Sequence, residues 1–193
     1  KWYDNMPVIS YIILSGKCRH CNSKISLQYP IVEFITGLLF VFVFIKFGLE
    51  KIYFYYIILT SFILLFSFID IEKKQVLNEL LVLFIFVILI FNIFEINHIN
   101  IFEALSGFII GGSIIYLLNF LSNGKIGEGD IKLFAAMGLA TGLKDVLYII
   151  FYSFLVGGLI SVFLVFFKNK KMQSKIPFVP FIAIAFFIRI FLK

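Results

Sequence analysis

Long apolar runs dominate the chain, and they constrain its fold more than any other feature. They lie at residues 31–48, 53–69, 76–95, 101–121, 131–143, 146–167 and 176–192. A transmembrane α-helix needs about 20 mainly apolar residues, and only helices and closed barrels satisfy their backbone polar groups in lipid. Because the runs are continuously apolar and do not alternate, they argue against a barrel. The sequence predicts an all-α fold, a polytopic transmembrane helical bundle with about seven apolar segments.

Composition excludes an ordinary soluble domain, because 62% of the 193 residues are hydrophobic, 15% are charged and the mean hydropathy is +1.06. The run 131–143 is short, but it follows Asp130 and contains Gly138 and Gly142, so we predict a short, tightly packed span and not a loop. The division expected is a polar cytoplasmic segment, 1–30, followed by a transmembrane domain, 31–193. Since the chain begins with Lys1 and not with Met, a segment upstream of it is expected.

Basic residues are distributed unevenly between the two ends of the predicted spans. If every run crosses, only five of the 17 basic residues fall on one side, namely Lys46, Lys51, Lys144, Arg189 and Lys193. Lys and Arg are enriched in cytoplasmic loops, so the opposite, more basic side is predicted to be cytoplasmic. Anionic lipid beside these loops accounts for the net charge of +6. We therefore expect the lipid bilayer as a partner, and no nucleic acid.

Two aspartates lie at span boundaries on this predicted cytoplasmic side. Asp70 follows the run 53–69, and Asp130 precedes the run 131–143. A carboxylate at membrane depth is a functional-site candidate by default, because burying its charge is costly. Two adjacent carboxyl groups can share one proton, so that one acts as base and the other as acid, as in aspartic proteases. We predict that Asp70 and Asp130 form a catalytic pair.

Asp130 ends the motif Gly127-Glu128-Gly129-Asp130. Gly127 and Gly129, with Gly124 and Lys125 before them, are predicted to adopt backbone conformations closed to other residues and to let another backbone approach closely. A peptide substrate must be extended at the point of cleavage, so its main chain needs such room. Asp130 is also predicted to begin a helix, where the helix dipole faces the carboxyl group. Asp70 is predicted to lack such a contact.

The only two cysteines occur in the polar segment, in Cys18-Arg19-His20-Cys21. Their spacing suits a zinc knuckle, but tetrahedral zinc needs four ligands, so the sequence supplies half a site. His20 lies between the cysteines and is poorly placed to bind the same ion. Cytoplasmic thiols stay reduced, which argues against a structural disulfide.

Motifs along nearly the whole chain resemble, in order, those of bacterial type IV prepilin peptidases, which are GxGD aspartic membrane proteases. The matching segments are Trp2-Tyr3-Asp4-Asn5 and the residues up to 11, then 16–21, 29–33, Asp70, 127–133 and 175–181. The resemblance implies an integral-membrane endopeptidase of the bacterial inner or plasma membrane. It would cleave the leader of type IV prepilins or pseudopilins on the cytoplasmic side, between a glycine and usually a phenylalanine.

The same resemblance implies roles for individual residues. Asp70 and Asp130 would be catalytic, Gly127, Gly129 and Lys132 would belong to the active-site loop, and proteolysis would need no cofactor. Many members also methylate the new N-terminus with S-adenosylmethionine. Cys18 and Cys21 would be the second half of a zinc-binding cysteine tetrad whose first half, with a further span, lies upstream.

Two positions depart from the family pattern, and neither is expected to touch the catalytic pair. Leu77, followed by Asn78, replaces a common proline, and Val179 replaces a usual glycine. A GxGD protease of the archaeal preflagellin or presenilin-like branch is a second interpretation, against which the Cys-x-x-Cys segment argues. A third is a proton- or cation-coupled transporter that uses Asp70 and Asp130, although no second Gly-rich break marks the other half.

Overall fold

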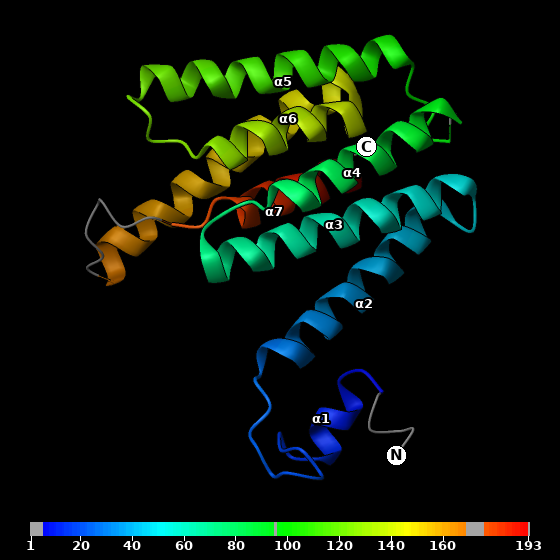
Figure 1. The fold of residues 1–193 in the computed structure, drawn as a ribbon, viewed down its shortest axis with the longest axis vertical. Coiled ribbons are helices and arrows are strands. Elements are labelled where there is room, and N and C mark those ends of the chain that lie inside the picture. Colours follow the sequence, from blue (N-terminus) through cyan, green and yellow to red (C-terminus); the bar gives the residue numbers. More distant parts are fainter. Residues whose placement is uncertain (1–5, 95, 169–175, 193) are drawn as a thin grey trace. The chain divides into compact units, whose positions relative to one another are not determined.

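The computed structural model describes residues 6–94, 96–168 and 176–192. Its helices are α1 (Ile9–Ile13), α2 (Gln28–Phe47), α3 (Lys51–Lys73), α4 (Asn78–Ile93), α5 (Ile101–Leu121), α6 (Glu128–Lys168) and α7 (Val179–Leu192), shown in Figure 1. The described residues form no strand, and the prediction of an all-α fold is confirmed for them. Some residues used in the sequence analysis lie outside the described ones, namely Lys1, Trp2, Tyr3, Asp4, Asn5, Lys170, Lys171, Lys175 and Lys193.

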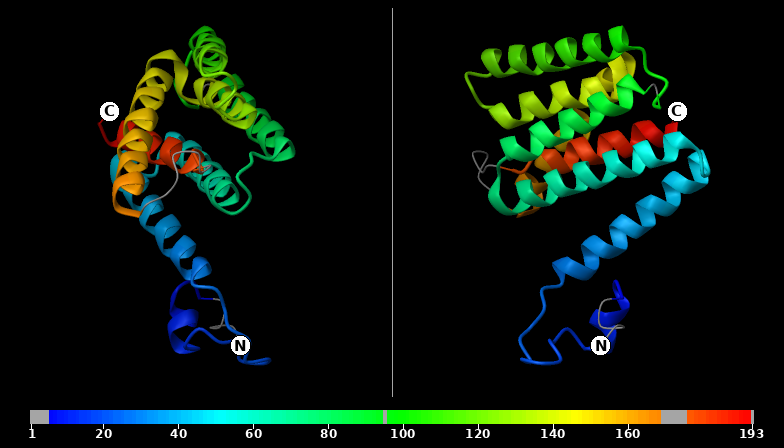
Figure 2. Two further views of the ribbon diagram at one scale, coloured as in Figure 1. Left: turned by 90° about the vertical axis from the view of Figure 1, so that its left-hand side faces the viewer. Right: turned by 45° about the vertical axis from the view of Figure 1, so that its right-hand side comes forward.

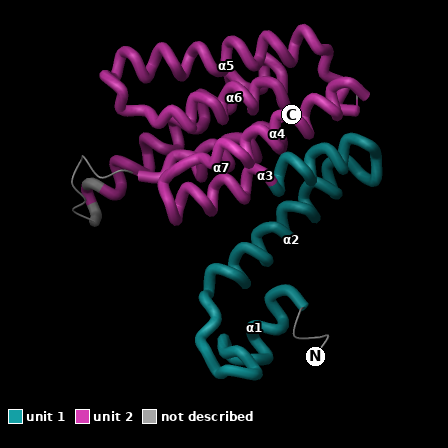
Figure 3. The backbone as a smooth tube through the Cα atoms, in the orientation of Figure 1, with its two compact units in different colours: residues 1–61 teal, residues 62–193 magenta. Residues whose placement is uncertain are grey.

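The chain divides into two compact units, residues 1–61 and 62–193, coloured separately in Figure 3. The boundary falls within α3. In the first unit, α2 ends at Gly48, whose φ of 63° lies in the left-handed region that favours glycine. The rings of Phe47 and Tyr56 stack 4.4 Å apart across this turn. The turn and the stack join α2 and the start of α3 into a helical hairpin.

All seven predicted apolar runs are found in helices, but not all these helices are long. Four of them, α2, α3, α5 and α6, are long and apolar enough to cross a membrane, judged by length and composition. The helices α4 and α7 have 16 and 14 residues, which corresponds to roughly 24 and 21 Å. Both are shorter than the hydrocarbon core of about 30 Å. The fold is therefore a polytopic helical one with two short apolar helices.

Gly142 interrupts α6, with a φ of 81° and a ψ of 173° that a residue with a side chain rarely adopts. The chain turns back after this point (Figure 1 and Figure 2). The break removes N–H partners from carbonyls of the preceding turn. Close to the break, the carbonyl of Leu139 accepts a hydrogen bond of 3.2 Å from the side-chain amide of Asn92 on α4, which in turn accepts one from Asn97. The segment 131–143 is thus helical, as predicted, and not a loop.

Glycines allow α5 to pack closely on the first part of α6. A Cβ atom added to Gly107 or to Gly138 would overlap the backbone carbonyl of the other residue. A Cβ added to Gly111 would lie 3.0 Å from the carbonyl oxygen of Phe134. Small residues at such contacts let membrane helices approach backbone to backbone. This contact fixes the position of the helix whose first turn contains Asp130.

An ion pair holds the end of α7 against the second part of α6. The Nε and Nη2 atoms of Arg189 donate to the same carboxylate oxygen of Asp145 at 2.9 and 2.7 Å. The guanidinium group also lies 4.5 Å from the centre of the Tyr148 ring. The two side chains of the pair are only 20% and 10% exposed. Ionisable groups at such positions are expected to be paired, and here the pair joins two helices.

We expect Arg189→Gln to lower the free energy of unfolding by about 2 kcal/mol, because two hydrogen bonds to a charged group are lost. Thermal unfolding of the detergent-purified protein measures the change. Lys51→Gln, at the exposed start of α3, removes the same charge and should leave the unfolding temperature close to that of the wild type. In a double-mutant cycle with Asp145→Asn, a coupling near zero would contradict the stabilising role of the pair.

Candidate active site

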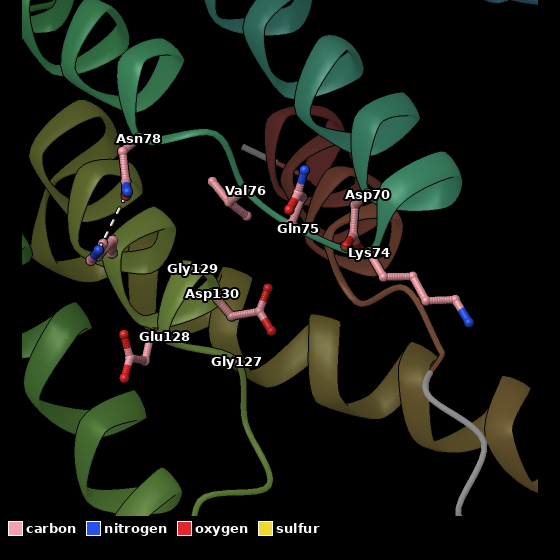
Figure 4. A pocket seen from close by; sticks show the side chains of 10 residues that line it. Asp70, Lys74, Gln75, Val76, Asn78, Gly127, Glu128, Gly129 and Asp130 are labelled. Carbon is pink, nitrogen blue, oxygen red and sulfur yellow. Dashed lines mark hydrogen bonds between the residues drawn. The ribbon is translucent and has the colours of Figure 1, made fainter.

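Asp70 and Asp130 line one pocket of about 300 Å³ in the second unit, shown in Figure 4. Its walls come from the end of α3, the connection to α4 and the start of α6. The other lining residues are Lys74, Gln75, Val76, Asn78, Gly127, Glu128, Gly129 and Lys132. The predicted catalytic pair and all three predicted loop residues are therefore brought together. Cys18 and Cys21 belong to the first unit and are not among the residues that line this pocket.

Asp70 lies in the last turn of α3 and is buried, with 6% of its surface exposed. Its Oδ2 atom accepts a hydrogen bond of 2.9 Å from the backbone N–H of Val179, the first residue of α7. The backbone of Phe178 is a further partner of this carboxyl group. Two expectations were wrong here. Asp70 does contact a helix N-terminus, and the departure at Val179 does touch the predicted catalytic pair.

Asp130 lies in the first turn of α6, as predicted, although the helix begins slightly earlier, at Glu128. Its backbone N–H donates to the carbonyl of Gly127 at 3.1 Å, so the turn closes on itself. The side chain is partly exposed. Figure 4 shows its carboxyl group pointing into the pocket, toward the side that carries Asp70 and Lys74. The two aspartates thus differ in environment: one is buried and anchored, and the other is open to the pocket.

The glycines of the motif matter because they leave room for neighbouring atoms, and not because of unusual backbone angles. A Cβ atom on Gly129 would lie 2.8 Å from the Cβ of Val76. Glycine at this position therefore lets the α3–α4 connection approach the start of α6, as predicted. Left-handed backbone is found at Gly124, with a φ of 75°, and not at Gly127 or Gly129. The predicted conformational reason is therefore confirmed for Gly124 and was wrong for Gly127 and Gly129.

Lys132 joins the two walls of the pocket. Its Nζ atom donates to the side-chain oxygen of Asn78 at 3.1 Å, drawn as a dashed line in Figure 4. Asn78 begins α4, and Lys132 lies one residue beyond the first turn of α6. The hydrogen bond joins α4, which follows Asp70 in the chain, to α6, which contains Asp130.

Cys18 and Cys21 lie in a tight loop of the first unit. The backbone N–H of Cys18 donates to the carbonyl of Ser23 at 2.9 Å, and an antiparallel bridge joins Lys17 to Lys24. The side-chain hydroxyl of Ser23, 2.9 Å from the Cys21 sulfur, is the main cause that lowers the pKa of Cys21 from 9.0 to about 7. The described residues contain no group of three or more His, Cys, Asp or Glu side chains that could hold a metal ion. The loop therefore presents two free thiols, one with a lowered pKa.

The pocket falls within a region that matches a known family. Residues 57–162, which include both aspartates and the whole Gly-x-Gly-Asp motif, match the model of the type IV leader peptidase family. The chain belongs to this family. Residues 1–47 match a second model, the bacterial peptidase A24 N-terminal domain, which contains the Cys-x-x-Cys loop. Both compact units of this leader peptidase family member are thus matched in part.

Curated relatives carry the name prepilin leader peptidase/N-methyltransferase. The protein of Xanthomonas campestris pv. campestris is 33% identical over 96% of this chain and 66% of its own length. That of Neisseria gonorrhoeae is 36% identical over 80% and 56%, and that of Pseudomonas aeruginosa is 33% identical over 95% and 64%. The chain thus spans between about half and two thirds of the length of these relatives. No solved structure matches it significantly.

Proposed function

We propose that this chain provides the catalytic site of an aspartic endopeptidase that removes the leader peptide of type IV prepilins or pseudopilins. The observation that carries the proposal is the shared pocket, in which Asp70 and Asp130 come from the ends of two apolar helices. Support for the substrate class comes from the family match and from the names of the relatives. The transporter interpretation finds no support, because these matches are to peptidases.

In the proposed mechanism the two carboxyl groups share one proton and hold a water molecule between them. The ionised group takes a proton from the water, whose oxygen then attacks the scissile carbonyl carbon. The protonated group donates its proton to the carbonyl oxygen. Collapse of the tetrahedral intermediate breaks the C–N bond: the amine leaves with a proton from the former base, and the former acid takes back a proton from a hydroxyl group of the intermediate, which restores the pair. Asp70 is the fixed partner of the pair, because it is buried and hydrogen-bonded to α7.

The substrate is proposed to lie with its apolar helix among the spans and its basic leader in the cytoplasm. Support comes from the excess of basic residues on the side of the two aspartates. On this proposal the protein lies in the bacterial inner or plasma membrane. It keeps the proposed division into a cytoplasmic segment, 1–30, and a transmembrane peptidase domain, 31–193.

Zinc and a methyl donor belong to the same proposal. Cys18 and Cys21 fit zinc in their donor chemistry, because both thiols are free and Cys21 ionises readily. They would supply two of the four ligands of a structural ion. The name N-methyltransferase of the relatives supports S-adenosylmethionine as cofactor of a second activity. Gly127, Gly129 and Lys132 are proposed to shape the cleavage site, which needs no cofactor.

The direct test is to incubate the full-length protein in detergent or liposomes with a purified prepilin and S-adenosylmethionine. Mass spectrometry of the product then reads both the loss of the leader and the mass of the new N-terminus. We expect cleavage after the glycine of the leader. A prepilin with a bulky residue in place of that glycine is the matched control and should stay intact. Folded protein that leaves the normal prepilin uncut would overturn the proposed function.

A further inference from the structure

The first turn of α7 reaches the pocket through its backbone. The Val179 N–H group donates to Asp70 Oδ2 at 2.9 Å, across 109 positions of the chain. Val179 is fully buried. The contact is therefore shielded from water, where a hydrogen bond to a charged group is strong.

The geometry of α7 makes this donor rigid. A backbone N–H at a helix start has no rotamers of its own, and the next residue, Pro180, has no N–H group. The N–H of Phe181 is already used, since it donates to the carbonyl of Phe178 at 2.9 Å. The other end of the helix is held by Arg189 and Asp145. The helix can thus present the Val179 N–H at a fixed place.

We propose that the backbone N–H of Val179 is a positioning group of the catalytic site. It holds Oδ2 of Asp70, so that the other carboxylate oxygen is directed to the water shared with Asp130. The inference rests on the proposed function, which it deepens by adding α7 to α3 and α6 as a third element of the site. The donor belongs to the main chain, so every residue except proline could supply it at this position.

The sharpest test replaces Val179 by its α-hydroxy acid, 2-hydroxyisovaleric acid, in the full chain. This change substitutes an ester oxygen for the N–H group and keeps the side chain. We expect kcat for prepilin cleavage to fall about 10- to 100-fold, as for other charged hydrogen bonds. KM should stay within about twofold, because the N–H group does not touch the substrate. The matched control is the same ester at Ile184, a partly exposed residue of the same helix, which should leave kcat near that of the wild type.

Equal losses from the two esters would mean that only the stability of α7 matters, and an unchanged kcat at position 179 would mean that the donor has no role. Either result would overturn the inference. A genetic pair gives a second measurement: Val179→Pro removes the N–H group, Val179→Ala keeps it, and proline is well suited to the first helical position. The proline variant should have about a tenfold lower kcat than the alanine variant.

A spectroscopic readout separates this inference from the proposed function. The carboxyl carbon of Asp70 is labelled with ¹³C, and its chemical shift is followed as a function of pH. The titration should differ from that of the wild type in the Val179 ester and should match it in the Ile184 ester. If the wild type does not cleave prepilin but this difference is seen, the substrate assignment fails and the positioning contact stands. If the wild type cleaves and the titration is the same in both esters, the positioning role fails alone.

Discussion

Asp70→Asn and Asp130→Asn are each expected to lower kcat/KM for prepilin cleavage by at least about 10³-fold, because one group must act as base while the other acts as acid. Asparagine keeps the shape of the side chain but cannot exchange a proton in this way. Its side-chain oxygen can still accept the hydrogen bond from Val179, so the fold around position 70 should survive. The measurement is the rate of leader removal by protein that unfolds at the same temperature as the wild type.

Glu79→Gln is the control for this pair of variants. Glu79 lies in the first turn of α4, close in sequence to Asn78, but it does not line the pocket and is exposed. Neutralising it should leave kcat/KM within about twofold of the wild type, as for most surface changes away from a site. Near-normal turnover by either aspartate variant would refute the shared-proton mechanism.

The sequence predicted the helices well, and it singled out the two aspartates that line one pocket, for a simple physical reason. Continuous apolar runs in lipid have few structural solutions, and a carboxylate at the end of such a run stands out. The same logic could have found Arg189, which lies inside the apolar run 176–192 and therefore needs a partner. Its partner, Asp145, lies next to another run and becomes identifiable only when the fold brings the two together.

Contacts made by the backbone could not be predicted in the same way. The hydrogen bond from Val179 to Asp70 involves an N–H group that almost every residue has, so no side-chain pattern marks it. The hydrogen bond of Asn92 is made to the backbone carbonyl of Leu139, close to the break of α6 at Gly142. Gly129 was recognised as important, but its reason, the approach of Val76, is visible only in three dimensions. In each case the signal lies in a neighbour distant along the chain.

Replacing a glycine of α6 by alanine should have very different effects on stability at Gly138 and at Gly158. In Gly138→Ala the new Cβ atom overlaps the carbonyl group of Gly107 on α5, and neither backbone can yield without moving a helix. We expect a loss of more than about 3 kcal/mol of unfolding free energy, above the usual range for overpacking. Because the first part of α6 carries Asp130, the same shift should also reduce prepilin cleavage by the protein that remains folded.

At Gly158, in the second part of α6, a new Cβ atom would have no atom within 4 Å. Gly158→Ala should therefore be neutral or stabilising by up to about 1 kcal/mol, because alanine is the better helix former. Thermal unfolding of the two variants side by side measures the difference. If both changed stability in the same direction and by the same amount, helix propensity alone would explain them. The close contact of α5 with α6 would then not determine where Asp130 lies.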